Sequence, residues 1–111
     1  MRKIVKQNLP GTSAGISFRD SYPAMSPTEG NHALLKVVDQ ASRDLGYGPV
    51  EALDPGERGA GDISFVASYL DGLDGIGAAG KGGHSMKEEV NLRLLPALTE
   101  RAALLIYRLT R

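Results

Sequence analysis

The chain has 111 residues, of which 41% are apolar, so it can bury a modest core and corresponds to one small domain or part of a larger one. Its 13 basic and 13 acidic residues give a net charge of zero without any run of like charge, so neither nucleic acid nor an anionic membrane is expected as a partner. The chain has no cysteine, which excludes disulfides and thiolate metal sites.

The first 22 residues have the pattern of a helix end followed by one strand. Apolar residues precede Pro10 and Gly11, which is typical of the end of a helix, and residues 14–19 alternate apolar and polar side chains as a half-buried strand does. These two elements cannot bury a sheet face alone, so residues 1–22 are interpreted as the end of a domain that continues upstream. No signal-peptide pattern is present, and the compartment stays open.

Residues 28–45 predict a long amphipathic helix. Either Thr28 or Asn31 can cap its first turn, and Gly46 is suited to end it. Four apolar residues at helical spacing form the stripe that would face a core. The stripe consists of Leu34, Val38, Ala41 and Leu45.

The middle of the chain predicts a strand, a helix and a second strand. Residues 49–53 and 73–78 are short apolar runs bounded by turn residues, and a helix is expected to begin at Asp62, which is suited to cap it. This alternation predicts a layered α/β fold.

The last predicted element is a C-terminal helix with Pro96 in its first turn. Its apolar stripe leaves Arg101 and Arg108 on the side expected to face water. The longest apolar run of the chain, residues 102–107, is far shorter than the ~20 residues of a membrane-spanning helix. The stripe consists of Leu98, Ala102, Leu105 and Leu109.

A glycine-rich stretch ending on His84 is the first candidate for function. Closely spaced glycines indicate sharp turns or close approach to another group, and the imidazole can bind a metal or accept a proton near neutral pH, with Ser85 and Glu88 as candidate orienting groups. Residues 75–81 match the first part of a phosphate-binding loop. The match fails at Gly82, where a Ser or Thr must hold magnesium.

A second candidate is the segment Gly59, Ala60, Gly61 and Asp62. It is either a simple turn in which Asp62 caps a helix, or a loop whose free backbone N–H groups bind a carboxylate or phosphate, which Arg58 would favour. Zinc needs three or four protein ligands, and no second histidine lies near His84 in the sequence, so His84 alone does not make a metal site.

Taken together, these motifs resemble a known enzyme family. The pattern Gly-x-Gly-Gly-His84-Ser85-x-x-Glu88-x-Val-Asn-Leu, preceded by Arg-Gly59-Ala60-Gly61-Asp62, is similar to the C-terminal part of the zinc-dependent aminoacylase and carboxypeptidase family. That family includes glutamate carboxypeptidases, acetylornithine deacetylases and succinyl-diaminopimelate desuccinylases. The resemblance covers essentially the whole chain, and the glutamate-carboxypeptidase-like branch fits best.

The resemblance implies a larger, two-domain enzyme that hydrolyses N-acyl amino acids or peptides with an acidic C-terminal residue. It implies a layered α/β/α catalytic domain with two zinc ions, interrupted by an α+β lid domain that often forms homodimers. His84 then matches the last metal-binding histidine, residues 59–62 match the loop that holds the substrate carboxylate, and Ser85 and Glu88 lie behind the histidine. Residues 1–22 correspond to the end of the lid, and residues 23–111 to the final third of the catalytic domain.

The chain departs from the family pattern in several places. It contains neither the His-x-Asp-x-Val motif nor the catalytic Glu-Glu pair, and it has Glu89 and Asn91 where an aromatic and an acidic residue are expected. The chain alone is therefore expected to lack catalytic residues, activity and tightly bound metal, and to need the N-terminal part of the enzyme as its partner. Cobalt or manganese could replace zinc, because one imidazole is compatible with all three. The alternative is a small non-catalytic binding or scaffold protein derived from that fold.

Overall fold

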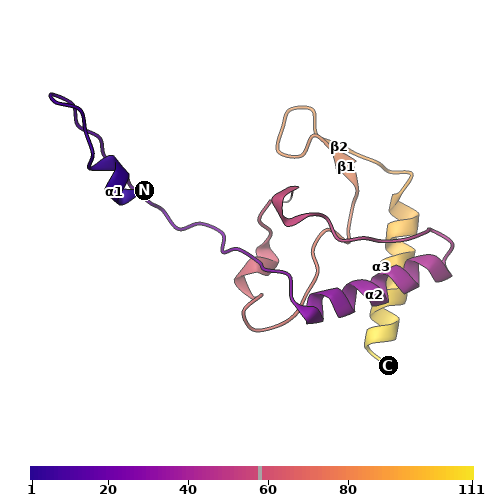
Figure 1. Cartoon of the computed structure of the whole chain (residues 1–111). Helices are drawn as coiled ribbons and strands as arrows, with labels where there is room; N and C mark the ends of the chain where they lie inside the picture. The colour runs from indigo at the N-terminus through magenta and orange to yellow at the C-terminus, as the bar shows by residue number, and fades with distance from the viewer. Residues whose placement is uncertain (58) are drawn as a thin grey trace.

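The computed structural model describes residues 1–57 and 59–111 and consists of a helical body with a projecting N-terminal arm (Figure 1). Its radius of gyration is 20.0 Å, and its extents are 66 × 35 × 19 Å. A compact chain of this length would have a radius of gyration of about 13 Å. The arm, which runs away from the body and carries the short helix α1 (Arg2–Val5), contributes to this difference.

Helix α2 (Glu29–Asp44) forms as its sequence pattern predicts. Thr28 is its N-cap, and the Thr28 hydroxyl accepts a hydrogen bond from the Asn31 N–H at 3.0 Å. At the other end Gly46 has φ 78°, and the N–H groups of Gly46 and Tyr47 donate to the carbonyls of Arg43 and Ser42. This is the Schellman arrangement, which satisfies the last carbonyls of the helix and favours glycine at the left-handed position.

Helix α3 (Leu95–Leu109) also forms as predicted, with Pro96 in its first turn. It crosses α2, and the two helices bury Val38, Ala41 and Leu105 (Figure 1). The prediction that Arg108 faces water is confirmed, because Arg108 is exposed, whereas Arg101 is half-buried. The Arg108 guanidinium lies 2.5 Å from the Asp44 carboxylate on α2. That ion pair ties the end of α3 to the end of α2.

The predicted strands at residues 14–19, 49–53 and 73–78 are not strands in the structure. Each lies in irregular or extended chain without a neighbouring strand, and a strand is stable only when its backbone groups pair with another. The sheet of the described residues has two strands, β1 (Gly80–Lys81) and β2 (Glu89–Val90), which are antiparallel with Gly80 opposite Val90. The layered α/β arrangement stays a prediction.

The helix expected to begin at Asp62 is a short 3-10 helix, η2 (Asp62–Phe65), and another, η1 (Pro55–Glu57), precedes it. The prediction that Asp62 caps the helix is wrong. Gly61 holds the cap position, and the Asp62 carboxylate instead accepts a hydrogen bond from the Tyr22 hydroxyl at 3.1 Å. Among the described helices, none is long and apolar enough to cross a membrane.

Candidate functional site

His84 lies in the loop that joins β1 to β2, at the end of the body opposite helix α2 (Figure 1). Its side chain is exposed, and neither ring nitrogen has a hydrogen-bond partner among the residues that the structure describes. An imidazole in this position is accessible to a metal ion or to a group on another molecule.

The backbone of His84 has φ 62°, and among the described residues it is the one non-glycine residue in the left-handed region. His84 is the third residue of a turn closed by the Ser85 N–H, which donates to the Gly82 carbonyl at 3.1 Å. A positive φ at the third position is the signature of a type II turn, where glycine is preferred. The loop therefore holds an unfavourable backbone conformation at His84, whose side chain can bind a metal or accept a proton near neutral pH.

Ser85 stabilises this turn through its hydroxyl. Its hydroxyl donates to the Gly82 carbonyl at 2.7 Å and accepts from the Lys87 N–H at 3.1 Å. Gly82 has φ 68°, and a Cβ there would come within 2.6 Å of the Lys87 carbonyl oxygen. These contacts hold both sides of the turn, so the position of the His84 backbone is determined by its neighbours.

Glu88 is exposed, and its carboxylate makes no hydrogen bond or ion pair within the described part of the chain. The ion pair of this hairpin instead joins Lys81 to Glu89 at 3.3 Å, across the two strands. A shallow groove of about 370 Å³ runs beside the hairpin and is lined in part by Lys81, Glu88 and Glu89. The orienting roles of Ser85 and Glu88 toward His84 stay predictions.

The segment from Gly59 to Asp62 lies elsewhere in the body and ends on the first residue of η2. The carboxylate of Asp74 packs directly on Gly61, where any Cβ would overlap it. The hydrogen bond from Tyr22 occupies the Asp62 carboxylate and raises the pKa of the Tyr22 hydroxyl. Arg58, which was expected to favour anion binding here, lies outside the described residues.

Two acidic side chains at this segment would oppose the approach of a substrate carboxylate. Gly59 and Ala60 are exposed and Gly61 is half-buried. Carboxylate binding by these residues therefore stays a prediction. The Asp74 and Tyr22 contacts join residues far apart in the chain, so no local sequence signal could have found them.

The described residues do not by themselves form a metal site, because no group of three His, Asp or Glu side chains in residues 1–57 and 59–111 is arranged to hold an ion. His32, the other histidine, is exposed on α2. One imidazole provides a single ligand where zinc takes three or four from protein. The residues present thus fit one ligand of a metal centre, and the remaining ligands would have to come from outside the described residues.

Comparison of the chain with protein-family models, with curated proteins and with solved structures finds no match.

Proposed function

We propose that the chain is the C-terminal part of a metal-dependent amidohydrolase or carboxypeptidase and that it donates one metal ligand, His84. The preferred metal would be zinc, and ligands from the N-terminal part of the enzyme would complete its coordination. The substrates would be N-acyl amino acids or peptides with an acidic C-terminal residue. The support is the motif around His84 in the sequence together with the exposed imidazole on a strained turn.

The strained turn is the observation that carries this proposal. A left-handed backbone at a residue other than glycine costs of the order of 1–3 kcal/mol and is retained mainly where surrounding contacts impose it, often at functional sites. Here those contacts come from Ser85 and Gly82, and they make no use of the imidazole. The turn therefore presents the ring to the outside while the backbone beneath it is held.

In such an enzyme the bound metal would supply a water of lowered pKa as the nucleophile. The role of this chain would be to bind the metal through one nitrogen of His84. According to the resemblance to the zinc-dependent family, the general base lies in the N-terminal part of the enzyme and not in this chain. The chain alone is accordingly expected to be inactive and to bind zinc weakly, because one imidazole forms no chelate.

The test is co-expression of the chain with the polypeptide encoded immediately upstream, followed by measurement of zinc content and of hydrolysis of N-acyl glutamate. The expected result is a complex that contains zinc and hydrolyses the substrate. H84A should lose at least about tenfold in zinc affinity, because losing a group that merely hydrogen-bonds to a metal ligand already costs about that much. H32A is the matched control, since His32 is also exposed but lies on α2.

Equal zinc content and activity in the H84A complex and the wild-type complex would refute the metal-ligand assignment. Failure of any upstream polypeptide to bind the chain or to restore metal-dependent activity would favour the alternative, a small non-catalytic binding or scaffold protein.

A further inference from the structure

The N-terminal arm, defined as residues 1–21, is a basic and apolar segment that does not pack against the body of its own chain. All of its side chains are exposed except that of Val5, which is half-buried. Its four basic residues and one acidic residue give it a net charge of +3. Ile4, Leu9, Ile16 and Phe18 are exposed apolar side chains on it.

The extended part of the arm also lacks backbone pairing. Within the described chain, no N–H group of residues 13–21 donates to another backbone group. Its alternating apolar and polar side chains give residues 14–19 one apolar face. A segment with these properties is a template for association with another surface.

The body carries a surface of complementary character, which we call the acceptor surface and define as residues 62–74. Asp62, Asp71 and Asp74 give it a net charge of −3, since it contains no basic residue. None of these three carboxylates forms an ion pair within the described part of the chain. Four large apolar side chains of the acceptor surface are exposed: Phe65, Val66, Tyr69 and Leu70.

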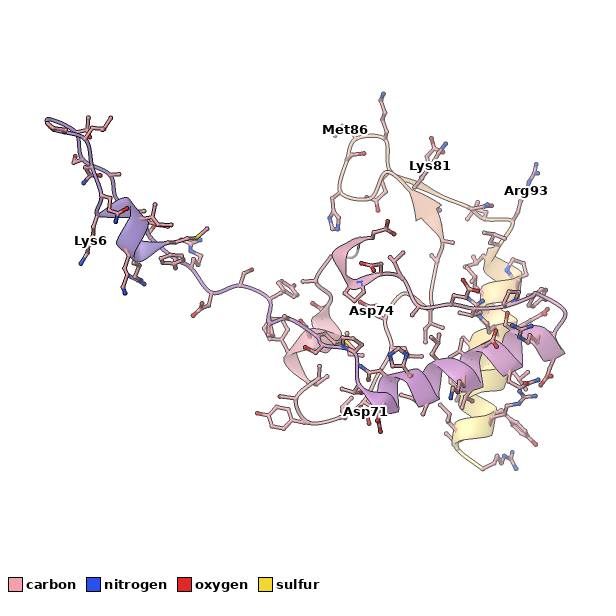
Figure 2. All side chains as sticks on the ribbon, viewed as in Figure 1. Lys6, Asp71, Asp74, Lys81, Met86 and Arg93 are labelled. Atoms are coloured by element: carbon pink, nitrogen blue, oxygen red, sulfur yellow. The ribbon has the colours of Figure 1, made fainter. Side chains whose placement is uncertain are left out.

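The arm leaves the body beside the acceptor surface. The Tyr22 ring lies 4.9 Å from the Phe65 ring, and its hydroxyl donates to Asp62. Six residues on, the Thr28 hydroxyl donates to the Asp71 carboxylate at 2.6 Å, beside the first turn of α2 (Figure 2). Residues 22–28 are thus bound at both ends along the acceptor surface. The arm, on the N-terminal side of Tyr22, points away from that surface (Figure 1).

We propose that the arm of one copy docks on the acceptor surface of a second copy, so that the chain forms an arm-exchanged dimer. The charges of +3 and −3 match, and both surfaces carry exposed apolar side chains. A second copy can supply residues 13–21 of its arm, which run without regular secondary structure between α1 and the body (Figure 1). The chain's own arm would have to reverse direction at Tyr22, which is held by Asp62 and Phe65.

Reciprocal exchange is self-complementary, as a two-fold dimer requires, and it buries both arms at once. Because the attraction is between exposed charges, the association should weaken as salt screens them. The loop that carries His84 is outside both surfaces. The dimer therefore does not use the proposed metal ligand.

The first test is light scattering of the full chain across a concentration series in low and high salt. A mass of twice 11.8 kDa is expected in low salt, with weaker association in high salt. The charge-reversed variant K3E/K6E should associate at least about tenfold more weakly in low salt, because exposed complementary charges contribute attraction at low ionic strength. A monomer at every concentration, or a dimer unaffected by K3E/K6E, would overturn the proposal.

The second test uses the absence of native cysteine. F18C protein mixed with Y69C protein should form a disulfide-linked heterodimer faster than F18C mixed with M86C. Met86 is fully exposed on the hairpin loop, away from the acceptor surface (Figure 2). Equal rates for the two mixtures, or an intramolecular disulfide in the double variant F18C/Y69C, would show that arms are not exchanged between copies.

Discussion

At the scale of single residues, the turn at Gly82–Ser85 has His84 at the position whose backbone conformation favours glycine. Gly83, which could adopt a left-handed conformation without cost, does not have a positive φ, whereas His84 does. Glycine at the position of His84 would remove this strain. The arrangement makes sense if the imidazole at that position has a use that offsets its backbone cost.

This strain predicts that His84 lowers the stability of the hairpin. H84G should lower the free energy of the paired strands relative to H84A by about 1 kcal/mol, because glycine accepts φ 62° without a clash. The population of the paired strands should rise accordingly. H84V should decrease it, because a β-branched side chain is least tolerant of a positive φ. The measurement is the cross-strand NOE between Gly80 and Val90, with Cα chemical shifts, in the three variants.

M86G serves as the control for a general effect of glycine in the loop, since Met86 does not have a positive φ. If H84G and H84V loosened the hairpin equally, the backbone of His84 would not be strained in solution.

At the scale of elements, α2 and α3 are held together by polar contacts as well as by apolar ones. The Arg108 guanidinium donates to Asp44, and the Tyr47 hydroxyl, just after α2, donates to the Glu100 carboxylate on α3. Hydrogen bonds from Arg108 and then from Gln40 lower the pKa of Asp44 below its usual value. The helix pair is therefore linked by two polar contacts, and the contact at Asp44 is expected to weaken when that carboxylate is protonated.

The lowered pKa of Asp44 predicts a loss of stability in acid. A carboxyl group whose pKa is lower in the folded state contributes stability above its unfolded pKa, which is about 3.9, and loses it as the pH falls through the folded value. The thermal midpoint of the wild type should fall as the pH is lowered below about 3.9. The midpoint of D44N should fall less over the same pH interval. E51Q is the matched control, because Glu51 makes no hydrogen bond within the described chain.

Asp39 acts in the same direction, because a hydrogen bond from the Val50 N–H and then one from Arg43 lower its pKa. D44N is thus expected to reduce the acid response without abolishing it. An acid response identical in D44N and wild type would mean that the contact with Arg108 does not contribute.

The elements also show why part of this fold was predictable. The helices α2 and α3 depend on local signals, namely a capping Thr28, a closing Gly46 and stripes of apolar residues, and the structure has both helices. The predicted strands depend on partners elsewhere in the chain or beyond it, and alternation alone cannot supply a partner. The sequence also singled out the loop of His84. The strain on His84 and the contact of Tyr22 with Asp62 depend on tertiary geometry and could not be predicted.

At the scale of the whole molecule, the core is small for the length of the chain. The buried apolar side chains of the described residues are Val38, Ala41 and Leu105, all at the crossing of α2 and α3. Large apolar side chains on the arm, on η2 and on the outer face of α3 remain exposed. Such surfaces are normally covered by association, which agrees with both a partner polypeptide and exchange of arms.

The small core predicts that stability depends heavily on one side chain. L105A should lower the free energy of unfolding by about 2–4 kcal/mol, because it removes most of a buried side chain where the helices meet. I106A should change it by less than about 0.5 kcal/mol, since Ile106 is the next residue of the same helix but is 63% exposed. Urea unfolding followed by the circular dichroism of the helices measures both variants under the same conditions. Because the native core is so limited, L105A is expected to be largely unfolded without denaturant, whereas I106A should retain the transition of the wild type. Equal losses from the two substitutions would mean that the outer face of α3 is also buried in solution, as it would be if another molecule covered it.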